Sequence, residues 1–262
     1  MDLGLKDKVA FISASSKGLG KGCALELAKE GAHVIISSRS EEDLIQAKRE
    51  IEAVAKGRVE YVVCDVTKSA DITKAIAFAN EKFGKVDILI NNAGGPPAGD
   101  FDKMGDDDWY HAFELNLLSF VRFIREVVPR MKEQQSGRII NLASSSVKQP
   151  ISGLILSNTF RPGVVGLSKT LSQELAPFNI LVNTVSPGSI ATDRLLSLNQ
   201  TRADKLGISI EEVEGNVKKS IPLGRYGDVS EFGKVVAFLA SDVSSYITGS
   251  SLLIDGGSVK SL

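Results

Sequence analysis

Residues 13–22 of the sequence, SASSKGLGKG, contain glycines at a spacing that suits nucleotide chemistry. Gly18, Gly20 and Gly22 follow an apolar run and open an amphipathic stretch. Glycines placed in this way let the backbone turn tightly and approach a pyrophosphate, which then lies at the positive N-terminus of a helix. A glycine turn can also be only a turn, but its position after a first strand favours a dinucleotide site.

The residues after the next apolar run, HVIISS, indicate which nucleotide would bind. Arg39 follows this run directly, and no carboxylate appears until Glu41. An NAD site usually places an acidic residue here for the ribose 2′-hydroxyl, whereas a 2′-phosphate needs cations and hydroxyl donors. Each cation alone could be a solvated surface residue. Together, Ser38 and Arg39, with Lys17 beside the glycines, predict NADP(H) in preference to NAD(H).

A second set of polar residues lies in the middle of the chain. Ser144 stands in INLASSS, and Ser157 and Arg161 lie four residues apart in LILSNTFRPGVVGLSKTL. A serine hydroxyl is a very weak acid and needs a neighbouring base, and an arginine stays protonated at any working pH. Since proline is tolerated best in a first helical turn, Pro162 predicts a helix that begins near Arg161. Arg161 would then face the ligand crevice of the fold, and Ser157 is a candidate cap of this helix.

The elements that must position these residues alternate between short β-branched runs and longer amphipathic stretches. The predicted strands are residues 8–13, 33–38, 58–64, 86–91, 137–143, 180–186 and 251–255. Several are nearly continuous apolar runs, which is typical of a parallel sheet buried on both faces. The repetition predicts right-handed βαβ units and therefore an α/β fold: a Rossmann-type doubly wound parallel sheet of seven strands with helices on both faces.

We expect one domain over residues 1–262, because no linker and no internal repeat divides the chain. Residues 193–220 interrupt the alternation. They are polar and helix-prone, and they follow the sixth strand as an insertion. Loops at the carboxyl ends of strands build the ligand crevice in such sheets, so this segment is predicted to be a lid over the substrate. A solvated pair of surface helices is the alternative.

Composition limits the classes of partner. The chain has 31 basic and 32 acidic residues, which provides no field for nucleic acid or an anionic membrane. Two cysteines and two histidines form neither a disulfide framework nor a metal site. The N-terminal residues lack a signal-peptide pattern, and no apolar run has the length of a membrane span. We therefore expect a cytoplasmic protein that acts on a small molecule without a metal.

The chain resembles the short-chain dehydrogenase/reductase family over nearly its whole length. The matching segments are the glycine turn after Ser13 (TGxxxGxG in the family), Asp65 in VVCDVT, NNAG at 91–94, Asn116 in ELNLLSF, Ser144 in INLASSS, PGSIAT at 187–192 and the ending ITGSSLLIDGG. The resemblance implies a cofactor site at Ser13, Ser15, Ser16, Lys17, Gly18, Leu19, Gly20, Ser38, Arg39, Asp65, Val66, Asn91, Ala93, Gly94, Pro187, Gly188, Ile190 and Thr192. In the family the aspartate contacts adenine, and the PGxIxT segment holds the nicotinamide carboxamide.

The resemblance also implies carbonyl/alcohol redox chemistry with NADP(H), similar to that of oxoacyl-thioester reductases and sugar dehydrogenases. It implies a homotetramer or homodimer packed through helices at about 107–133 and 156–176. One departure is specific. The family's proton donor is a tyrosine, followed four residues later by a lysine, and Ser157 and Arg161 stand at those positions. The 13-residue gap between Ser144 and Ser157 is the spacing that the family shows.

Three functions fit this pattern. The first, which we favour, is an active reductase in which Ser144 and Ser157 bind the substrate oxygen and Asn116 holds a water. Arg161 would stabilise charge, span the nicotinamide ribose hydroxyls as the family's lysine does, or bind a carboxylate or phosphate of the substrate. Loss of the general acid would cost about 10²–10⁴-fold in rate. The second is an NADP(H)-binding scaffold or sensor without turnover. The third is a lyase or isomerase that uses Arg161 as an anion clamp.

Overall fold

The seven predicted strands form one parallel sheet in the computed structural model, which describes residues 2–261. The strands are β1 (Val9–Ile12), β2 (His33–Ser38), β3 (Val59–Val63), β4 (Ile88–Asn91), β5 (Gly137–Leu142), β6 (Ile180–Pro187) and β7 (Ser251–Ile254). Each begins and ends within two residues of its predicted bounds. Their order in the sheet is β3-β2-β1-β4-β5-β6-β7, so the predicted fold class is confirmed.

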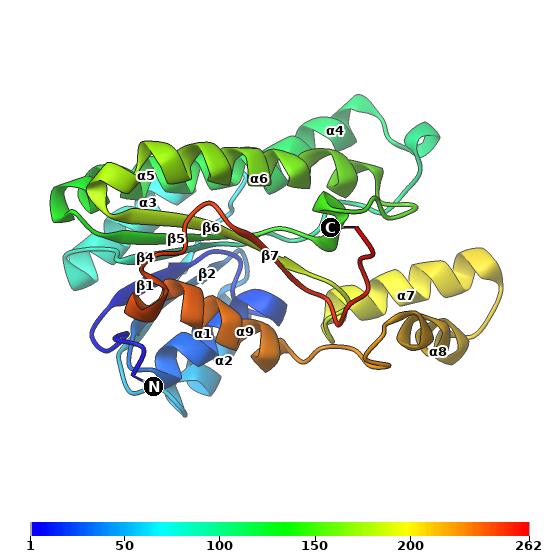
Figure 1. Ribbon diagram of the computed structural model, residues 1–262, viewed down its shortest axis with the longest axis horizontal. Coiled ribbons are helices and arrows are strands. Elements are labelled where there is room, and N and C mark those ends of the chain that lie inside the picture. The colour runs from blue at the N-terminus through cyan, green and yellow to red at the C-terminus, as the bar shows by residue number, and fades with distance from the viewer. Residues whose placement is uncertain (1, 262) are drawn as a thin grey trace.

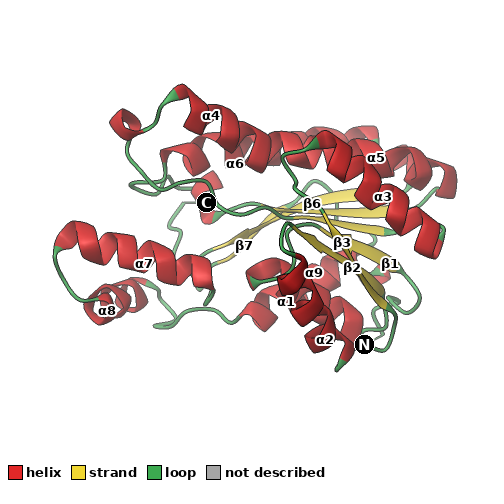
Figure 2. Ribbon diagram, turned by 180° about the vertical axis from the view of Figure 1, so that it is seen from behind, coloured by secondary structure: helices red, strands yellow, loops and turns green. Residues whose placement is uncertain are grey.

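Helices cover both faces of this sheet, as Figures 1 and 2 show. One face carries α1 (Gly18–Lys29), α2 (Glu41–Glu52) and α9 (Val229–Ala240). The other face carries α3 (Ser69–Phe83), α5 (Ser119–Gln134) and α6 (Ile155–Glu174). Two apolar cores result, one on each side of the strands. The strands β1, β2, β4, β5 and β6 are buried along nearly their whole length because both of their faces are covered.

The strand order creates one crevice at the carboxyl edge of the sheet. β1 pairs with β2 on one side and with β4 on the other, so Ile12 lies beside both Ile36 and Ile90. The connection after β1 therefore runs toward one side of the sheet, and the connection after β4 runs toward the other. α/β proteins bind their ligands at such a switch point. The ends of β1 to β6 and the segments that follow them carry most of the predicted site residues, and the others lie in the helical segments that begin at Glu114 and Ile155.

The predicted insertion at 193–220 consists of two helices. They are α7 (Asp193–Leu206) and α8 (Ile210–Ser220), and they project beyond the end of the sheet (Figure 1). The segment leaves and rejoins the body at one place. The Ala191 N–H donates to the Gly227 carbonyl at 2.9 Å, and the Gly227 N–H donates to the Ser189 carbonyl at 3.0 Å. The insertion is therefore narrow at its base, and α7 also contacts the loop after β4 through Arg194 and Lys205.

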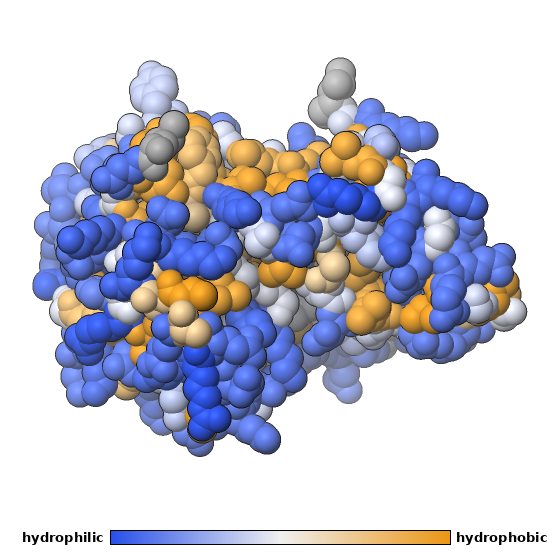
Figure 3. Space-filling model, turned by 90° about the horizontal axis from the view of Figure 1, so that it is seen from below, coloured by the Kyte–Doolittle hydropathy of each residue, from blue (hydrophilic) through white to orange (hydrophobic). Residues whose placement is uncertain are grey.

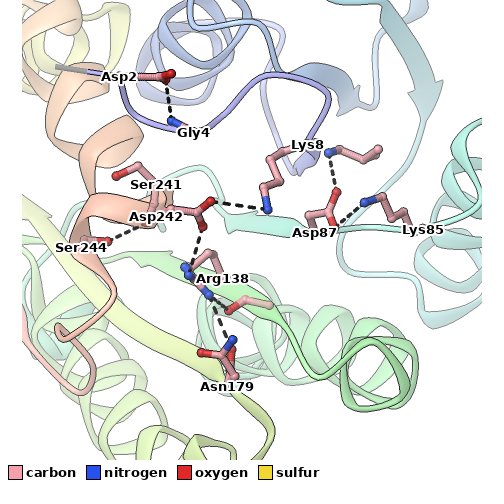
Figure 4. Close-up of polar contacts among 12 residues, drawn as sticks. Asp2, Gly4, Lys8, Lys85, Asp87, Arg138, Asn179, Ser241, Asp242 and Ser244 are labelled. Atoms are coloured by element: carbon pink, nitrogen blue, oxygen red, sulfur yellow. Dashed lines mark hydrogen bonds and ion pairs between the residues drawn. The ribbon is translucent and has the colours of Figure 1, made fainter.

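Charged side chains close the opposite, amino-terminal edge of the sheet (Figure 4). Arg138, at the start of β5, is buried and lies 3.4 Å from Asp242 Oδ1. Asp242 also pairs with Lys8 at 3.7 Å, and its backbone N–H donates to the Leu3 carbonyl. Nearby, Asp87 Oδ2 accepts the Val9 N–H at 2.8 Å. These contacts join the first residues of the chain to its last quarter.

The surface is largely hydrophilic on the face seen from below, and its apolar residues form separate patches there (Figure 3). Among residues 2–261, no helix combines the length and the apolar character that a membrane crossing requires.

Candidate active site

The glycine turn between β1 and α1 is shaped by close backbone packing. A β-carbon on Gly20 would lie 2.7 Å from the Ala14 carbonyl oxygen and 2.8 Å from Asn92 Nδ2. Gly18 has a φ of +55°, which favours glycine. The first turn of α1 has no acidic residue, and no described side chain caps it. The N–H groups at this helix end are therefore available to an anion, and the turn fits a pyrophosphate.

Asn92, which the sequence reasoning did not single out as a site residue, holds this turn in place. Its Nδ2 donates to the Ala14 carbonyl at 2.9 Å, and Ala14 has a left-handed φ of +47°. Ser13 Oγ donates to the Asn92 carbonyl at 2.7 Å and accepts the Asn92 N–H at 2.8 Å. The hydroxyl of Ser15 is buried between β1 and β2, where it accepts the Ser37 N–H at 3.0 Å. Both predicted serines thus hold backbone segments together.

At the end of β2 the two predicted cations differ in their surroundings. Lys17 Nζ lies 3.0 Å from Asp43 Oδ2, and the hydrogen bond to this carboxylate raises the pKa of Lys17. Arg39 is exposed, and Ser38 beside it is half-buried. Arg39 is the predicted cation that remains open to a 2′-phosphate, because Lys17 already has an acidic partner.

Asp65 lies beyond the end of β3, and Val66 next to it is buried. Burial acts to raise the pKa of Asp65, but the two hydrogen bonds that its Oδ1 accepts from the Thr67 hydroxyl and N–H, at 2.8 and 3.0 Å, and the charge of Lys68 help to bring it below its usual range. The positive charge of Arg39 acts in the same direction. Asp65 and Arg39 therefore belong to one region of the carboxyl edge.

The segment after β6 faces the glycine turn. A β-carbon on Gly18 would lie 3.7 Å from Thr192 Cγ2, and one on Gly188 would lie 2.6 Å from Asp255 Cβ. Ile190 is buried, and Thr192 caps α7 by accepting the Leu195 N–H at 3.3 Å. The structure thus brings the predicted residues 187–192 to the same edge as the glycines, and Pro187 is the last residue of β6.

The loop after β4 is open on one side. Ala93 is buried, but Gly94 is exposed, and a β-carbon there would meet no atom within 4 Å. Asn116 Nδ2 donates to the Gly94 carbonyl at 2.8 Å. Asn116 belongs to a π-helical segment, Glu114–Leu118, that joins α4 (Asp106–Phe113) to α5. Single π-helical turns within α-helices are frequent at functional sites.

Buried carbonyl oxygens of two asparagines lack a protein partner. Asn116 Oδ1 and Asn91 Oδ1 accept no hydrogen bond from the described residues. The Nδ2 of Asn91 donates to Asn141 Oδ1 at 2.8 Å, which fixes the Asn91 amide between β4 and β5. An orphaned buried acceptor calls for a donor such as a water or a bound ligand. Both oxygens therefore fit a site that receives a further molecule.

Two serines, Ser144 and Ser146, follow the end of β5, and the second contacts Ser157 of α6. Ser144 Oγ accepts the Ser146 N–H at 3.1 Å and caps a short 3₁₀ turn, Ser145–Val147. Ser146 Oγ lies 3.3 Å from Ser157 Oγ, and these two side chains are 3% and 7% exposed. Ser146 was not predicted as a site residue, although the run of serines at 144–146 contains it. Within the described chain, no carboxylate, imidazole or amine hydrogen-bonds to the Ser146–Ser157 pair, so neither hydroxyl has a base to activate it.

The predicted helix start near Arg161 is wrong. α6 begins at Ile155, its N-cap position is Leu154, and Pro162 lies inside the helix. Ser157 is therefore an interior residue of the first turn and caps nothing. The helix continues through Pro162 because Leu156 and Val164, before and after it, are fully buried, and such packing outweighs the local preference.

Arg161 is a buried cation that connects three elements. Its Nη1 donates to the Leu142 carbonyl at 2.7 Å, and its Nη2 to the Ala93 carbonyl at 3.4 Å. Its Nε has no hydrogen-bond partner among residues 2–261. Burial lowers the pKa of Arg161 to about 10, and the positive charge of Arg194 adds to the effect. The group stays protonated near neutral pH, and so places a positive charge beneath the crevice.

The chain is similar to known reductases over nearly its whole length. A family model described as enoyl-(acyl carrier protein) reductase matches residues 13–259. The 3-oxoacyl-[acyl-carrier-protein] reductase FabG of Thermotoga maritima is 36% identical over 255 residues, which are 97% of this chain and 99% of the relative. Dehydrogenase/reductase SDR family member 4 of Oryctolagus cuniculus is 34% identical over 254 residues, 97% of this chain and 94% of the relative.

A solved structure shows the same architecture. The L-sorbose reductase from Gluconobacter frateurii, complexed with NADPH and L-sorbose, matches with a TM-score of 0.95 and 32% identity over the full length of both chains.

Proposed function

Because the chain belongs to the short-chain dehydrogenase/reductase family, we propose that it is an NADP(H)-dependent oxidoreductase that interconverts a carbonyl and an alcohol on a small substrate. The observation that carries the proposal is the glycine turn, in which Gly20 has no room for a side chain and α1 presents an uncapped N-terminus. The exposed Arg39, with no acidic residue at the end of β2, supports the phosphorylated cofactor. The NADPH complex of the sorbose reductase agrees with this choice.

The cofactor, when bound, supplies the hydride, and the chain's residues must bind the substrate oxygen and provide a proton. We assign oxygen binding to the hydroxyls of Ser144 and Ser157. Arg161 stabilises the negative charge that develops on this oxygen, because its own charge is buried and fixed. A water held by Asn116 Oδ1 delivers the proton from solvent. No group here titrates near neutrality, so we expect proton transfer to be slower than from an activated tyrosine, by about 10²–10⁴-fold.

We assign the role of a substrate lid to α7 and α8. The pair leaves and rejoins the body at Ala191 and Gly227, and the contacts of α7 with the loop after β4 must open for it to move as a unit. Leu196 and Leu206 are 50% and 60% exposed. Exposed leucines on a segment beside the crevice suit a cover for the apolar part of a substrate better than a solvated helix pair.

We further propose that the protein forms a homodimer or homotetramer through α4, α5 and α6. Tyr110 on α4 is 71% exposed, and Phe113 is partly exposed beside Phe160 of α6, with ring centroids 6.0 Å apart. Gly166 on α6 leaves open space around its backbone. An exposed aromatic group next to a flat helix surface is typical of a subunit interface.

A catalytically silent NADP(H)-binding protein is the second candidate. The observation that favours it is the Ser146–Ser157 contact, which occupies the position of the proton donor with two hydroxyls that lack a base. Such a protein would keep the whole nucleotide site and lose only turnover.

The test combines cofactor binding with a substrate panel. We expect NADPH to bind more tightly than NADH, and NADPH to be oxidised by at least one member of a panel of 3-oxoacyl thioesters, enoyl thioesters and ketoses. Arg39→Asp should shift the preference toward NADH by about tenfold or more, since it removes a charge-assisted contact. Arg49→Asp, the same charge reversal at an exposed site on α2, is the control.

Two results would contradict these assignments. Tight NADPH binding without oxidation by any compound would favour the silent binding protein. An Arg39→Asp variant with an unchanged ratio of NADPH to NADH affinity would show that the 2′-phosphate lies elsewhere.

A further inference from the structure

A second arginine, Arg194, reaches the loop after β4 from the lid. It lies in the first turn of α7, and its Nη2 donates to the Pro96 carbonyl at 2.7 Å. A β-carbon on Gly95 would lie 2.8 Å from Arg194 Nε and 3.0 Å from its Cζ. The absence of a side chain at Gly95 therefore lets the guanidinium lie against the backbone of this loop.

Arg194 and Arg161 bring two positive charges to the same loop. Arg161 donates to the Ala93 carbonyl from α6, and Arg194 donates to the Pro96 carbonyl from α7. Burial lowers the pKa of Arg161, and the charge of Arg194 lowers it further, in keeping with the position of both groups at this loop. No carboxylate of residues 2–261 forms an ion pair with either guanidinium. Two like charges at one loop, without a carboxylate partner, favour the binding of an anion from outside the chain.

The stability of the lid does not explain Arg194. A cation in the first turn of a helix opposes the helix macrodipole, which favours acidic residues there. A separate ion pair, Lys205 with Asp100 at 2.9 Å, already connects α7 to the end of the same loop. Arg194 remains partly open to solvent, although burial against the loop lowers its pKa, whereas the buried Arg161 retains a guanidinium N–H without a partner among the described residues. The arrangement suits a ligand that enters from solvent and meets Arg194 first.

We propose that Arg194 and Arg161 form an anion subsite, and that the substrate is a carbonyl compound carrying a small oxyanion, either a carboxylate or a phosphate. The inference rests on the proposed reductase function and deepens it by naming the substrate class. The fork of Arg194 binds the oxyanion, since a guanidinium matches the planar spacing of its oxygens. Arg161 supplies the second charge from below. The carbonyl then lies on the side of Ser144 and Ser157.

The test compares the turnover of an anionic substrate with that of its uncharged analogue. We expect kcat/KM with NADPH to be at least about tenfold higher for a 3-oxo acid than for its methyl ester. The same comparison of kcat/KM between a keto-phosphate and its dephosphorylated form shows whether the subsite prefers phosphate to carboxylate. Arg194→Met should bring the ratio of acid to ester toward one, and Arg194→Lys should restore part of it. Arg202→Met removes a charge from an exposed position on the same helix and should leave the ratio unchanged.

A binding measurement separates this inference from the reductase proposal. Malonate should bind to the NADP⁺ complex in calorimetry, its neutral diamide should not, and Arg194→Met should abolish malonate binding even if no compound is turned over. An equal preference for acid and ester, together with no malonate binding, would overturn the subsite. A loss of NADPH affinity in Arg194→Met, with the acid-to-ester ratio preserved, would assign the two charges to the cofactor and would also overturn it.

Discussion

At the scale of single residues, the centre of the site is defined by what Ser157 and Arg161 contact. Ser157 shares a hydrogen bond with Ser146, and Arg161 donates to the backbone carbonyls of Leu142 and Ala93. Neither side chain can exchange a proton near neutral pH. Both occupy positions that could still bind an oxygen atom or stabilise charge.

Restoring the usual acid tests this interpretation directly. The double variant Ser157→Tyr/Arg161→Lys should raise kcat for carbonyl reduction by about 10²-fold or more, because a phenol near a lysine and a cationic cofactor has a lowered pKa. The pH profile of kcat should gain an ionisation that the parent chain lacks. Ser146→Ala is the matched control, since it removes the partner hydroxyl without adding an acid. An unchanged kcat with intact NADPH binding would indicate a pocket built for other chemistry.

Much of the site could be predicted from single residues, but only where a motif assigns them a role. Gly20, Asn116 and Ser144 were predicted in this way, and the structure places them at one edge of the sheet. Asn92 belongs to the quoted NNAG motif but was not predicted as a site residue, and Arg194 was missed altogether. The importance of both comes from contacts with Ala14 and Pro96, which are distant in sequence. No spacing rule reports such contacts.

At the scale of elements, helix α1 depends on glycine for its packing as well as for its turn. A β-carbon on Gly22 would overlap Val229 Cγ1 at the start of α9 and lie 3.2 Å from the Val229 carbonyl oxygen. Gly22→Ala should therefore lower the free energy of unfolding by about 1–3 kcal/mol, despite the better helix propensity of alanine. Chemical denaturation measures this change.

Another helical glycine provides the control. Gly215 lies inside α8, and a β-carbon added there would meet no atom within 4 Å, so Gly215→Ala should raise the stability by about 0.5–1 kcal/mol. Adding Val229→Ala to Gly22→Ala should recover part of the loss. Similar effects of the two single alanines would show that packing against α9 is not the cause.

The elements also show where local sequence signals fail. The strands were predicted well because apolar, β-branched runs between polar segments have few other structural solutions. The start of α6 was misplaced because Pro162 was interpreted from the preference of proline for a first helical turn. Burial of Leu156 and Val164 instead extends the helix by two turns toward its N-terminus. The π-helical segment at Asn116 has no sequence signal that we recognise.

At the scale of the whole molecule, the two edges of the sheet have separate tasks. The carboxyl edge carries the candidate site, and the amino edge carries the charged contacts of Figure 4. Arg138 is buried there, and burial lowers its pKa while Asp242 acts in the opposite direction. The contact between these two residues joins parts of the chain that are 104 residues apart.

Removing the carboxylate of Asp242 should destabilise the amino edge of the sheet. We expect Asp242→Ala to lower the free energy of unfolding by about 1–3 kcal/mol, because a buried guanidinium loses a charged partner. Lys8→Met removes the more exposed pair with the same carboxylate and should cost less than about 1 kcal/mol. Urea unfolding of both variants measures the difference. An equal loss of unfolding free energy in both variants would mean that the contact between Asp242 and Arg138 does not stabilise the fold.

The pairing of β7 with β6 has a consequence for the newly made chain. β6 is complete at Pro187, but its partner residues, Ser251–Ile254, are made last of all the strands. During synthesis, at about 5–20 residues per second, an apolar strand edge thus waits for several seconds without its neighbour. Unpaired edges of this kind recruit other chains. The final strand therefore covers the edge of β6 late in synthesis and itself becomes the edge of the sheet. A chain that stops before it would leave the longer, more deeply buried β6 as an open edge.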